Sequence, residues 1–287
     1  MERFKEFKNE IRANVPLAMH TWFQLGGPVQ FFAEPKTEEE LSTILKRCME
    51  ETIPVRILGA GSNIIIPDDG IPGMVISLVD ACFCGIQIRG HSVTAGAGAK
   101  LGRVVTASAH GGLAGIENLV GLPGTIGGAI LGNVSSSGDS IGQWITGIRV
   151  ANEKGEVFCL NRSELSLNFE ENFLRDMVIL DVTLTLEEDD PLELAKRLQK
   201  IWIIKKTMFP LGHQCSGCIF RNPRGVLAGE LIENAGLKGT RIGGAIVSDR
   251  NANFIVAEPE CTSSDILRLI ELVKNQVLDR TDIELET

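Results

Sequence analysis

Apolar residues recur with helical spacing in five stretches of the chain. In residues 37–51, Thr37 and Glu40 form a predicted capping box, and the apolar residues that follow share one face. Residues 101–110, 228–236 and 262–277 predict three more helices. A fifth helix is predicted to start at Pro191 with Asp190 as its cap, and to carry Leu194, Leu198, Ile201 and Trp202 on its apolar stripe.

Alternating and β-branched runs predict strands between these helices. Residues 53–58 and 63–67 are predicted strands on either side of a tight turn. Further strands are predicted in 73–78, 83–98 and 177–188, and a hairpin in 147–160. The chain is therefore predicted to be α+β, and the acidic run at 187–190 is the best candidate for a domain boundary.

Composition and charge narrow the class of protein. The chain has 287 residues, of which 44% are apolar, and its formal net charge of -9 disfavours nucleic acid as a partner. It contains no apolar run of membrane-spanning length, and its charged first residues lack the core of a secretory signal. Seven cysteines, an odd number, fit a reducing compartment, and their spacing gives no metal site. We expect a cytoplasmic protein.

Three glycine-rich turns lie among apolar residues, at 59–63, 96–102 and 121–133. The first lacks the third glycine of a dinucleotide fingerprint, because Ile64 stands there, and the second lacks the ending of a P-loop. Bare backbone lets a ligand approach closely, so we favour a ligand cradle. Tight packing of a turn against a helix is the alternative, and it alone explains one or two of the glycines.

A second candidate site lies in the basic stretch from Lys196 to Arg241, which has nine basic residues against two acidic ones. Charge among glycines and turns favours a compact anion such as a diphosphate. Within it, Cys218 is a candidate proton donor whose thiol pKa the neighbouring cations would tune. Cys218 could instead be a buried structural cysteine, or form a redox dithiol with Cys215.

Seven segments together carry a family resemblance. The sequences "TWFQLGG", "ILGAGSN", "AGAG", "GIENLVGLPGTIGGAILGN", "GCIFRNP", "AGELIENAGLKGTRIGGAIVS" and "NANFIVA" occur in this order over nearly the whole chain. In these segments the chain resembles the UDP-N-acetylenolpyruvoylglucosamine reductase (MurB) family, in its shorter subtype without a tyrosine-bearing substrate loop. The chain has no tyrosine.

The resemblance implies an FAD-binding fold of the vanillyl-alcohol-oxidase (PCMH) type. Two FAD-binding subdomains would comprise residues 1–85 and 86–190. An α+β substrate domain would comprise 191–287, with its tail returning to the first subdomain. The implied activity is NADPH-dependent reduction of UDP-N-acetylglucosamine enolpyruvate to UDP-N-acetylmuramate, a step in peptidoglycan precursor synthesis. FAD and NADPH are the implied cofactors, and we expect a monomer.

The resemblance also implies site residues. Cys218 stands where the family has a proton-donating serine, and Arg221, Asn222 and Lys205 are implied substrate contacts. Glu286 and Arg175 are further catalytic candidates. The implied cofactor contacts are Gly59, Ala60, Gly61, Ser62, Asn63, Gly96, Gly98, Pro123, Gly124, Thr125, Gly127, Gly128, Asn133 and Arg241.

Two positions depart from the family pattern. Phe169 and Glu170 align with its tyrosine–arginine pair, so a negative charge replaces the activating cation, and Arg175 is the nearest substitute. In the family's terminal Leu-Glu-x-Glu segment, Glu286 matches the first glutamate and the second would lie beyond Thr287. We expect either a chain cut short, which we favour, or a catalytic role for Glu286 or Glu284. A sugar or alcohol oxidase of the same fold, or a flavin-binding protein with impaired catalysis, are the alternative functions.

Overall fold

The computed structural model describes residues 4, 7, 10–136, 138–165, 173–209, 214–215, 217–223 and 225–287. Its contacts divide the chain into two compact units. The first comprises 1–15, 29–60 and 72–203, and the second 16–28, 61–71 and 204–287. The second unit thus takes two short segments from the N-terminal part of the chain and begins within a helix, at Ile204. The division into 1–85, 86–190 and 191–287 stays a prediction.

The first unit opens with a four-stranded sheet in the order β1-β2-β4-β3. Its elements are β1 (Ile11–Pro16), β2 (Pro28–Ala33), α1 (Glu38–Glu50), β3 (Val55–Leu58) and β4 (Ile71–Ser77). As predicted, the Thr37 hydroxyl caps α1, accepting from the Glu40 amide. The Glu40 carboxylate accepts from the Lys36 amide instead of completing the box at Thr37. Local sequence therefore set the start of this helix.

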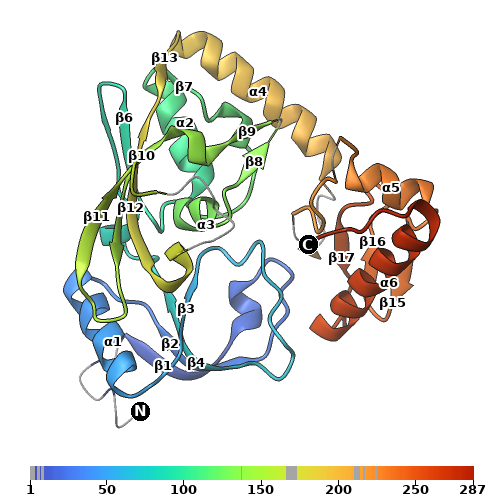
Figure 1. Ribbon diagram of the computed structural model, residues 1–287, viewed down its shortest axis with the longest axis horizontal. Helices are drawn as coiled ribbons and strands as arrows, with labels where there is room; N and C mark the ends of the chain where they lie inside the picture. Colours follow the sequence, from blue (N-terminus) through green and yellow to red (C-terminus); the bar gives the residue numbers. More distant parts are fainter. Residues whose placement is uncertain are drawn as a thin grey trace. The chain divides into compact units, whose positions relative to one another are not determined.

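An antiparallel sheet of five strands follows in the same unit, in the order β11-β10-β12-β6-β5. Figure 1 shows α2 and α3 beside this sheet. Short strands and one-turn helices connect these elements. The bounds are β5 (Ile86–Arg89), β6 (Ser92–Gly96), α2 (Leu101–His110), β7 (Leu113–Ala114), α3 (Ile126–Leu131), β8 (Ser135–Ser136), β9 (Asp139–Ser140), β10 (Ile145–Ala151), β11 (Val157–Asn161), β12 (Val178–Thr185) and β13 (Glu187–Glu188), with 3-10 helices at Ala81–Phe83, Glu117–Leu119, Ile141–Trp144 and Phe173–Asp176.

The predicted strand at 63–67 is wrong. β3 and β4 pair in parallel, so the chain between them must cross over instead of turning back as a hairpin. Residues 59–70 make that crossover, and 63–67 have no strand partner. Ile66 is buried against Gly26, whereas Ile64 is 39% exposed. The apolar side chains of this run therefore do not share one face of a sheet.

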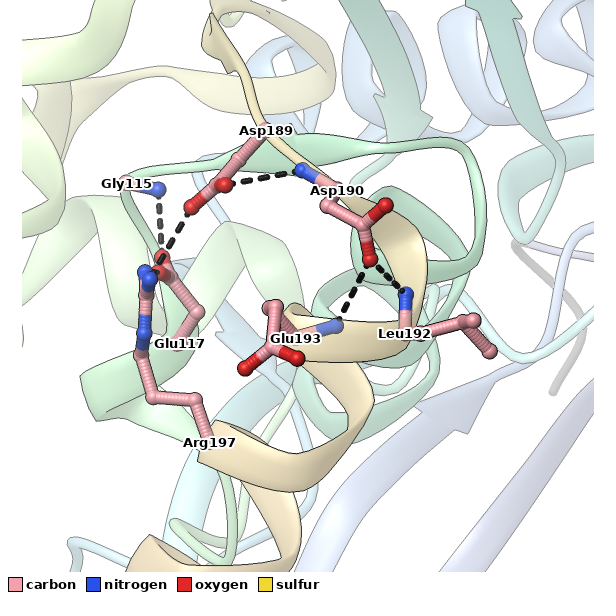
Figure 2. A network of polar contacts seen from close by, with 7 residues as sticks. All are labelled: Gly115, Glu117, Asp189, Asp190, Leu192, Glu193 and Arg197. Carbon is pink, nitrogen blue, oxygen red and sulfur yellow. Dashed lines mark hydrogen bonds and ion pairs between the residues drawn. The ribbon is translucent and has the colours of Figure 1, made fainter.

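Helix α4 (Pro191–Met208) is anchored at its start by a polar network, shown in Figure 2. The Asp190 carboxylate caps the helix, accepting from the amides of Leu192 and Glu193 at 2.8 and 3.0 Å. One turn later, Arg197 bridges the buried carboxylate of Glu117 and that of Asp189. The Asp190 cap was predicted; the role of Arg197 was not, because its partner Glu117 lies 80 residues away in the sequence.

The second unit is a small α+β unit with its own apolar core. Its four-stranded sheet has the order β14-β17-β16-β15 and is antiparallel. Its elements are a 3-10 helix (Leu17–His20), β14 (Gln214–Cys215), α5 (Ala228–Asn234), β15 (Arg241–Ile242), β16 (Ala245–Val247), β17 (Ile255–Ala257) and α6 (Ser263–Thr281). Gly236, with φ +66°, ends the α5 segment as predicted, and Thr262 caps α6 in a complete capping box with Asp265.

The predicted apolar stripe of α4 is correct for Leu194 and Leu198, which are buried, and wrong for Trp202, which is 45% exposed. Trp202 lies one residue before the point where the first unit ends. Helical periodicity assumes a single partner surface, and α4 continues past the core that Leu194 joins. No helix among the described residues is long and apolar enough to cross a membrane.

Candidate functional site

A groove lies in the first unit at the carboxyl ends of the parallel strands β3 and β4. It holds a cavity of about 70 Å³ and is partly open to solvent. In open α/β sheets, this end of the strands is where ligands usually bind. The lining residues come from five segments and are mostly apolar: Ile57, Leu58, Gly59, Ser77, Leu78, Val79, Ala97, Gly98, Thr125, Gly127, Gly128, Leu131, Met177 and Ile179.

The three glycine-rich turns meet at this groove. The backbone of the third pairs with that of the second, since the amides of Ile126 and Gly127 donate to the carbonyls of Ala99 and Ala97 at 2.8 and 2.9 Å. The first turn reaches Thr125, because a Cβ added at Gly59 would lie 2.7 Å from the Thr125 hydroxyl oxygen. Two of these bare turns therefore touch the third, as a shared cradle requires.

The glycines of the cradle serve different purposes. A Cβ at Gly98 would overlap the Leu78 carbonyl, and one at Gly127 would lie 2.9 Å from the Cβ of Ala97, so both are explained by close packing. Gly124 has φ +134°, which a side chain disfavours. A Cβ at Gly128 would meet only the Thr125 hydroxyl, at 3.5 Å, and otherwise open space. Packing does not require a glycine at 128, so the open groove is the better reason for it.

Some predicted cofactor residues do not line this groove. Gly61, Ser62 and Asn63 fall in the second unit, together with Arg241, whose guanidinium pairs with Glu258 at 2.5 Å. The Asn133 carboxamide accepts from the Gly142 amide at 3.1 Å and so holds the chain after α3. Ala60, Gly96, Pro123 and Gly124 belong to the first unit but are absent from the lining.

The sequence analysis did not identify the apolar wall of the groove. Ile57, Val79 and Leu131 are 40%, 60% and 38% exposed, and together they present an apolar surface in the groove. They come from β3, from the residues after β4, and from the end of α3. Each belongs to an ordinary strand or helix pattern, so no local signal marks it. The parallel pairing of β3 with β4 would have been needed to place them together.

A second group of predicted residues lies in the second unit, on the irregular loop 217–223. The side chains of Cys218, Arg221 and Asn222 are exposed on this loop. The Arg221 amide donates to the carbonyl of Glu286 at 2.8 Å, which fixes the tail of the chain against the loop. Leu285 is fully buried beside it. Cys218, Arg221 and Glu286 therefore lie in one region of the second unit.

The electrostatics of the loop differ from the expectation of a thiol tuned by cations. The protein around Cys218 excludes water and so raises the pKa of its thiol above the ordinary value, although the side chain reaches the surface. The thiol is therefore protonated at neutral pH. Burial lowers the pKa of Lys205, which belongs to the same unit, to about 8.

Asn222 has a structural contact as well as an exposed position. Its carboxamide oxygen accepts from the Ala228 amide at 3.0 Å, at the first residue of α5. The pattern of the loop did not indicate this contact, which joins residues six apart around a turn.

Of Phe169, Glu170 and Arg175, the structure describes only Arg175. Arg175 lies in the 3-10 helix Phe173–Asp176 of the first unit, and its side chain is exposed. Phe169 and Glu170 lie outside the described residues. The replacement of an activating arginine by Glu170 therefore stays a prediction.

Comparisons with known proteins match two separate parts of the chain. Residues 29–161 match the FAD binding domain, and residues 209–287 match the C-terminal domain of UDP-N-acetylenolpyruvoylglucosamine reductase. The reductase of that name from Rhodopirellula baltica is 36% identical over 96% of this chain and 90% of its own length. The one from Halalkalibacterium halodurans is 35% identical over 97% and 93%.

A solved structure agrees over nearly the full length as well. The crystal structure of the reductase (MurB) from Thermus caldophilus superposes with a TM-score of 0.80 at 30% identity, covering 96% of this chain and 97% of that one. The predicted α+β fold with an FAD-binding domain is thereby confirmed. The chain belongs to the UDP-N-acetylenolpyruvoylglucosamine reductase (MurB) family.

Proposed function

We propose that the protein is an FAD-containing oxidoreductase that reduces UDP-N-acetylenolpyruvoylglucosamine to UDP-N-acetylmuramate with NADPH. The observation that carries this proposal is the pair of sites in two matched segments. A groove with an open glycine lies mostly in the FAD-binding segment, and a protonated thiol three residues before an arginine lies in the reductase-specific segment. Peptidoglycan precursor synthesis is the corresponding role.

The groove suits FAD, because bare backbone at Gly128 and the apolar wall of Ile57, Val79 and Leu131 accommodate a flat, partly apolar ligand. We assign it to part of the cofactor. Bound FAD supplies the ability to take a hydride from NADPH and deliver it to a carbon atom. The chain's share of the binding is a rigid cradle, in which Thr125 caps α3 and stands against Gly59.

Cys218 is the proposed proton donor. Hydride addition to the β-carbon of the enolpyruvyl group leaves an electron pair on the α-carbon, delocalised into the carboxylate. The thiol then gives its proton to that α-carbon, and the resulting thiolate regains a proton from water. A raised thiol pKa suits this role, since the proton must be present before the step begins.

The remaining candidates have supporting roles in this proposal. Arg221 and Lys205 attract the carboxylate and diphosphate of the substrate, and cations near the carboxylate stabilise the charge that develops there. Asn222 makes a further contact with the substrate. Glu286 and Arg175 contact its enolpyruvyl group, which is the group that is reduced. We further propose a cytoplasmic monomer, and the seven free cysteines suit a reducing compartment.

Anaerobic stopped-flow absorbance tests the proposal in two steps. NADPH should bleach the visible absorbance of the bound flavin, and the enolpyruvyl sugar should then restore it, with product appearing in equal amount. An oxidase would instead be reduced by a sugar or alcohol and reoxidised by oxygen. Reduction by NADPH without any return on adding the sugar would refute the proposal and indicate impaired catalysis.

A further inference from the structure

Asn253 is a buried polar residue whose carboxamide is hydrogen-bonded at both its oxygen and its nitrogen. Its side-chain oxygen accepts from the Phe220 amide at 2.8 Å, and its side-chain nitrogen donates to the Phe220 carbonyl at 2.8 Å. Its own carbonyl accepts from the Ile219 amide at 2.9 Å. A single residue that is 5% exposed thus makes three hydrogen bonds to two adjacent residues. The pattern resembles strand pairing, but one side chain supplies two of the bonds.

The residues that Asn253 holds lie between the two groups assigned to the chemistry. Cys218 directly precedes Ile219, and Arg221 directly follows Phe220. The loop 217–223 has no helix or strand of its own, so regular hydrogen bonding does not fix it. The Phe220 side chain is 4% exposed within the core of the unit, so the loop is held inward at its centre. Its flanking side chains, Cys218 and Arg221, are exposed.

Asn253 is itself held in place. Its amide donates to the carboxamide oxygen of Asn251 at 3.0 Å, and β17 begins two residues later. The three consecutive amides of the loop, at 219, 220 and 221, therefore end on Asn253 and on the Glu286 carbonyl. Of Asn253 and Glu286, Asn253 is the residue whose side chain also donates a hydrogen bond to the loop. Its carboxamide therefore fixes both the position and the orientation of the backbone at Phe220.

We propose that Asn253 is a positioning residue for the reduction of the enolpyruvyl sugar. By holding the loop, it sets the positions of the Cys218 thiol and the Arg221 guanidinium. This rests on the proposed function of Cys218. Proton transfer needs the thiol within hydrogen-bond reach of the α-carbon, and a misplacement of about 1 Å costs roughly 100-fold in rate. The NADPH step needs no proton from this loop, so Asn253 does not influence it.

The variant Asn253→Asp tests the proposal because the introduced carboxyl group can donate a hydrogen bond only when it is protonated. A carboxylate accepts from the Phe220 amide but repels the Phe220 carbonyl, whereas a protonated carboxyl donates to it as the amide does. Burial beside a carbonyl raises the pKa of the introduced group. We expect the rate of flavin reoxidation by the sugar, relative to wild type, to be about 100-fold lower at pH 8.5 and to recover as the pH falls toward 5.5.

The control is Thr262→Ala, which removes the cap of α6 in the same unit without touching the loop. It should lower the melting temperature while leaving the reoxidation rate and its pH profile unchanged. A rate for Asn253→Asp equal to that of wild type, or reduced by the same factor at every pH, would overturn the proposal. Reduction of the bound flavin by NADPH should be unchanged in both variants.

A second variant keeps the test decisive if Asn253→Asp does not fold. Asn251→Ala removes the acceptor of the Asn253 amide and should lower the reoxidation rate about tenfold. An unchanged rate would count against the proposal. If wild-type protein itself shows no return of flavin absorbance with the sugar, the proposed function fails. If wild type returns and Cys218→Ala does so equally fast, the role of Cys218 fails.

Discussion

Gly128 and Gly127 are adjacent in α3 and should respond oppositely to the same substitution. At Gly128 a leucine side chain projects into the open groove, and replacing a helical glycine contributes up to about 1 kcal/mol of stability. At Gly127, which also lines the groove, the same side chain starts 2.9 Å from the Cβ of the buried Ala97. Overpacking of this kind costs about 1–3 kcal/mol. Gly128→Leu should therefore fold well and exclude the cofactor, while Gly127→Leu should fold poorly.

Thermal unfolding with and without added FAD measures both effects. At a free FAD concentration of 100 times Kd, binding contributes about 2.7 kcal/mol to the apparent stability of the wild type. For a protein of this size, that corresponds to an increase in Tm of roughly 4–5 °C. Gly128→Leu should match or exceed the Tm of the wild type without FAD and gain nothing from FAD. A gain equal to that of the wild type would show that the cofactor does not pass the open side of Gly128.

Two further predictions concern charge. Arg197→Ala leaves the carboxylate of Glu117, which is 8% exposed, with the Gly115 amide as its hydrogen-bond donor. We expect the free energy of unfolding, measured in urea, to fall by about 1–2 kcal/mol. The control Lys196→Ala removes an exposed ion pair and should lower it by less than about 0.5 kcal/mol. An equal loss in both variants would contradict this. Burial lowers the pKa of Lys205 to about 8, so its ammonium is charged below that pH and neutral above it. Calorimetry should find that affinity for the UDP-sugar falls as the pH rises through about 8, and that Lys205→Met removes this fall; the same slope in both proteins would exclude Lys205 from the site.

The sequence predicted features whose causes are local. Thr37, Asp190 and Thr262 each cap the helix that they were expected to start, because a hydroxyl or carboxylate placed there meets amides two or three residues ahead. The Gly127–Ala97 packing shows the limit of the same approach. Five glycines in thirteen residues indicated a cradle, but only tertiary contacts separate the glycines that the fold requires from the one that faces open space.

Features that depend on distant pairing could not be predicted from the sequence. The run at 63–67 has the composition of a strand, yet β3 and β4 are parallel and the run serves as their crossover. Asn253 lies in the segment "NANFIVA", which contributed only to the family resemblance. Its contact with Phe220 joins residues 33 apart. Burial around Cys218 likewise depends on packing between segments. Neighbouring cations were expected to tune the pKa of its thiol, but burial raises that pKa instead.

Anaerobic stopped flow of Cys218→Ala and wild type tests directly whether the Cys218 thiol donates the proton. General-acid groups contribute about 100- to 10,000-fold. The account predicts that NADPH reduces the flavin at the same rate in both proteins, and that reoxidation by the enolpyruvyl sugar slows at least 100-fold in the variant. Reoxidation at the wild-type rate in Cys218→Ala would contradict it.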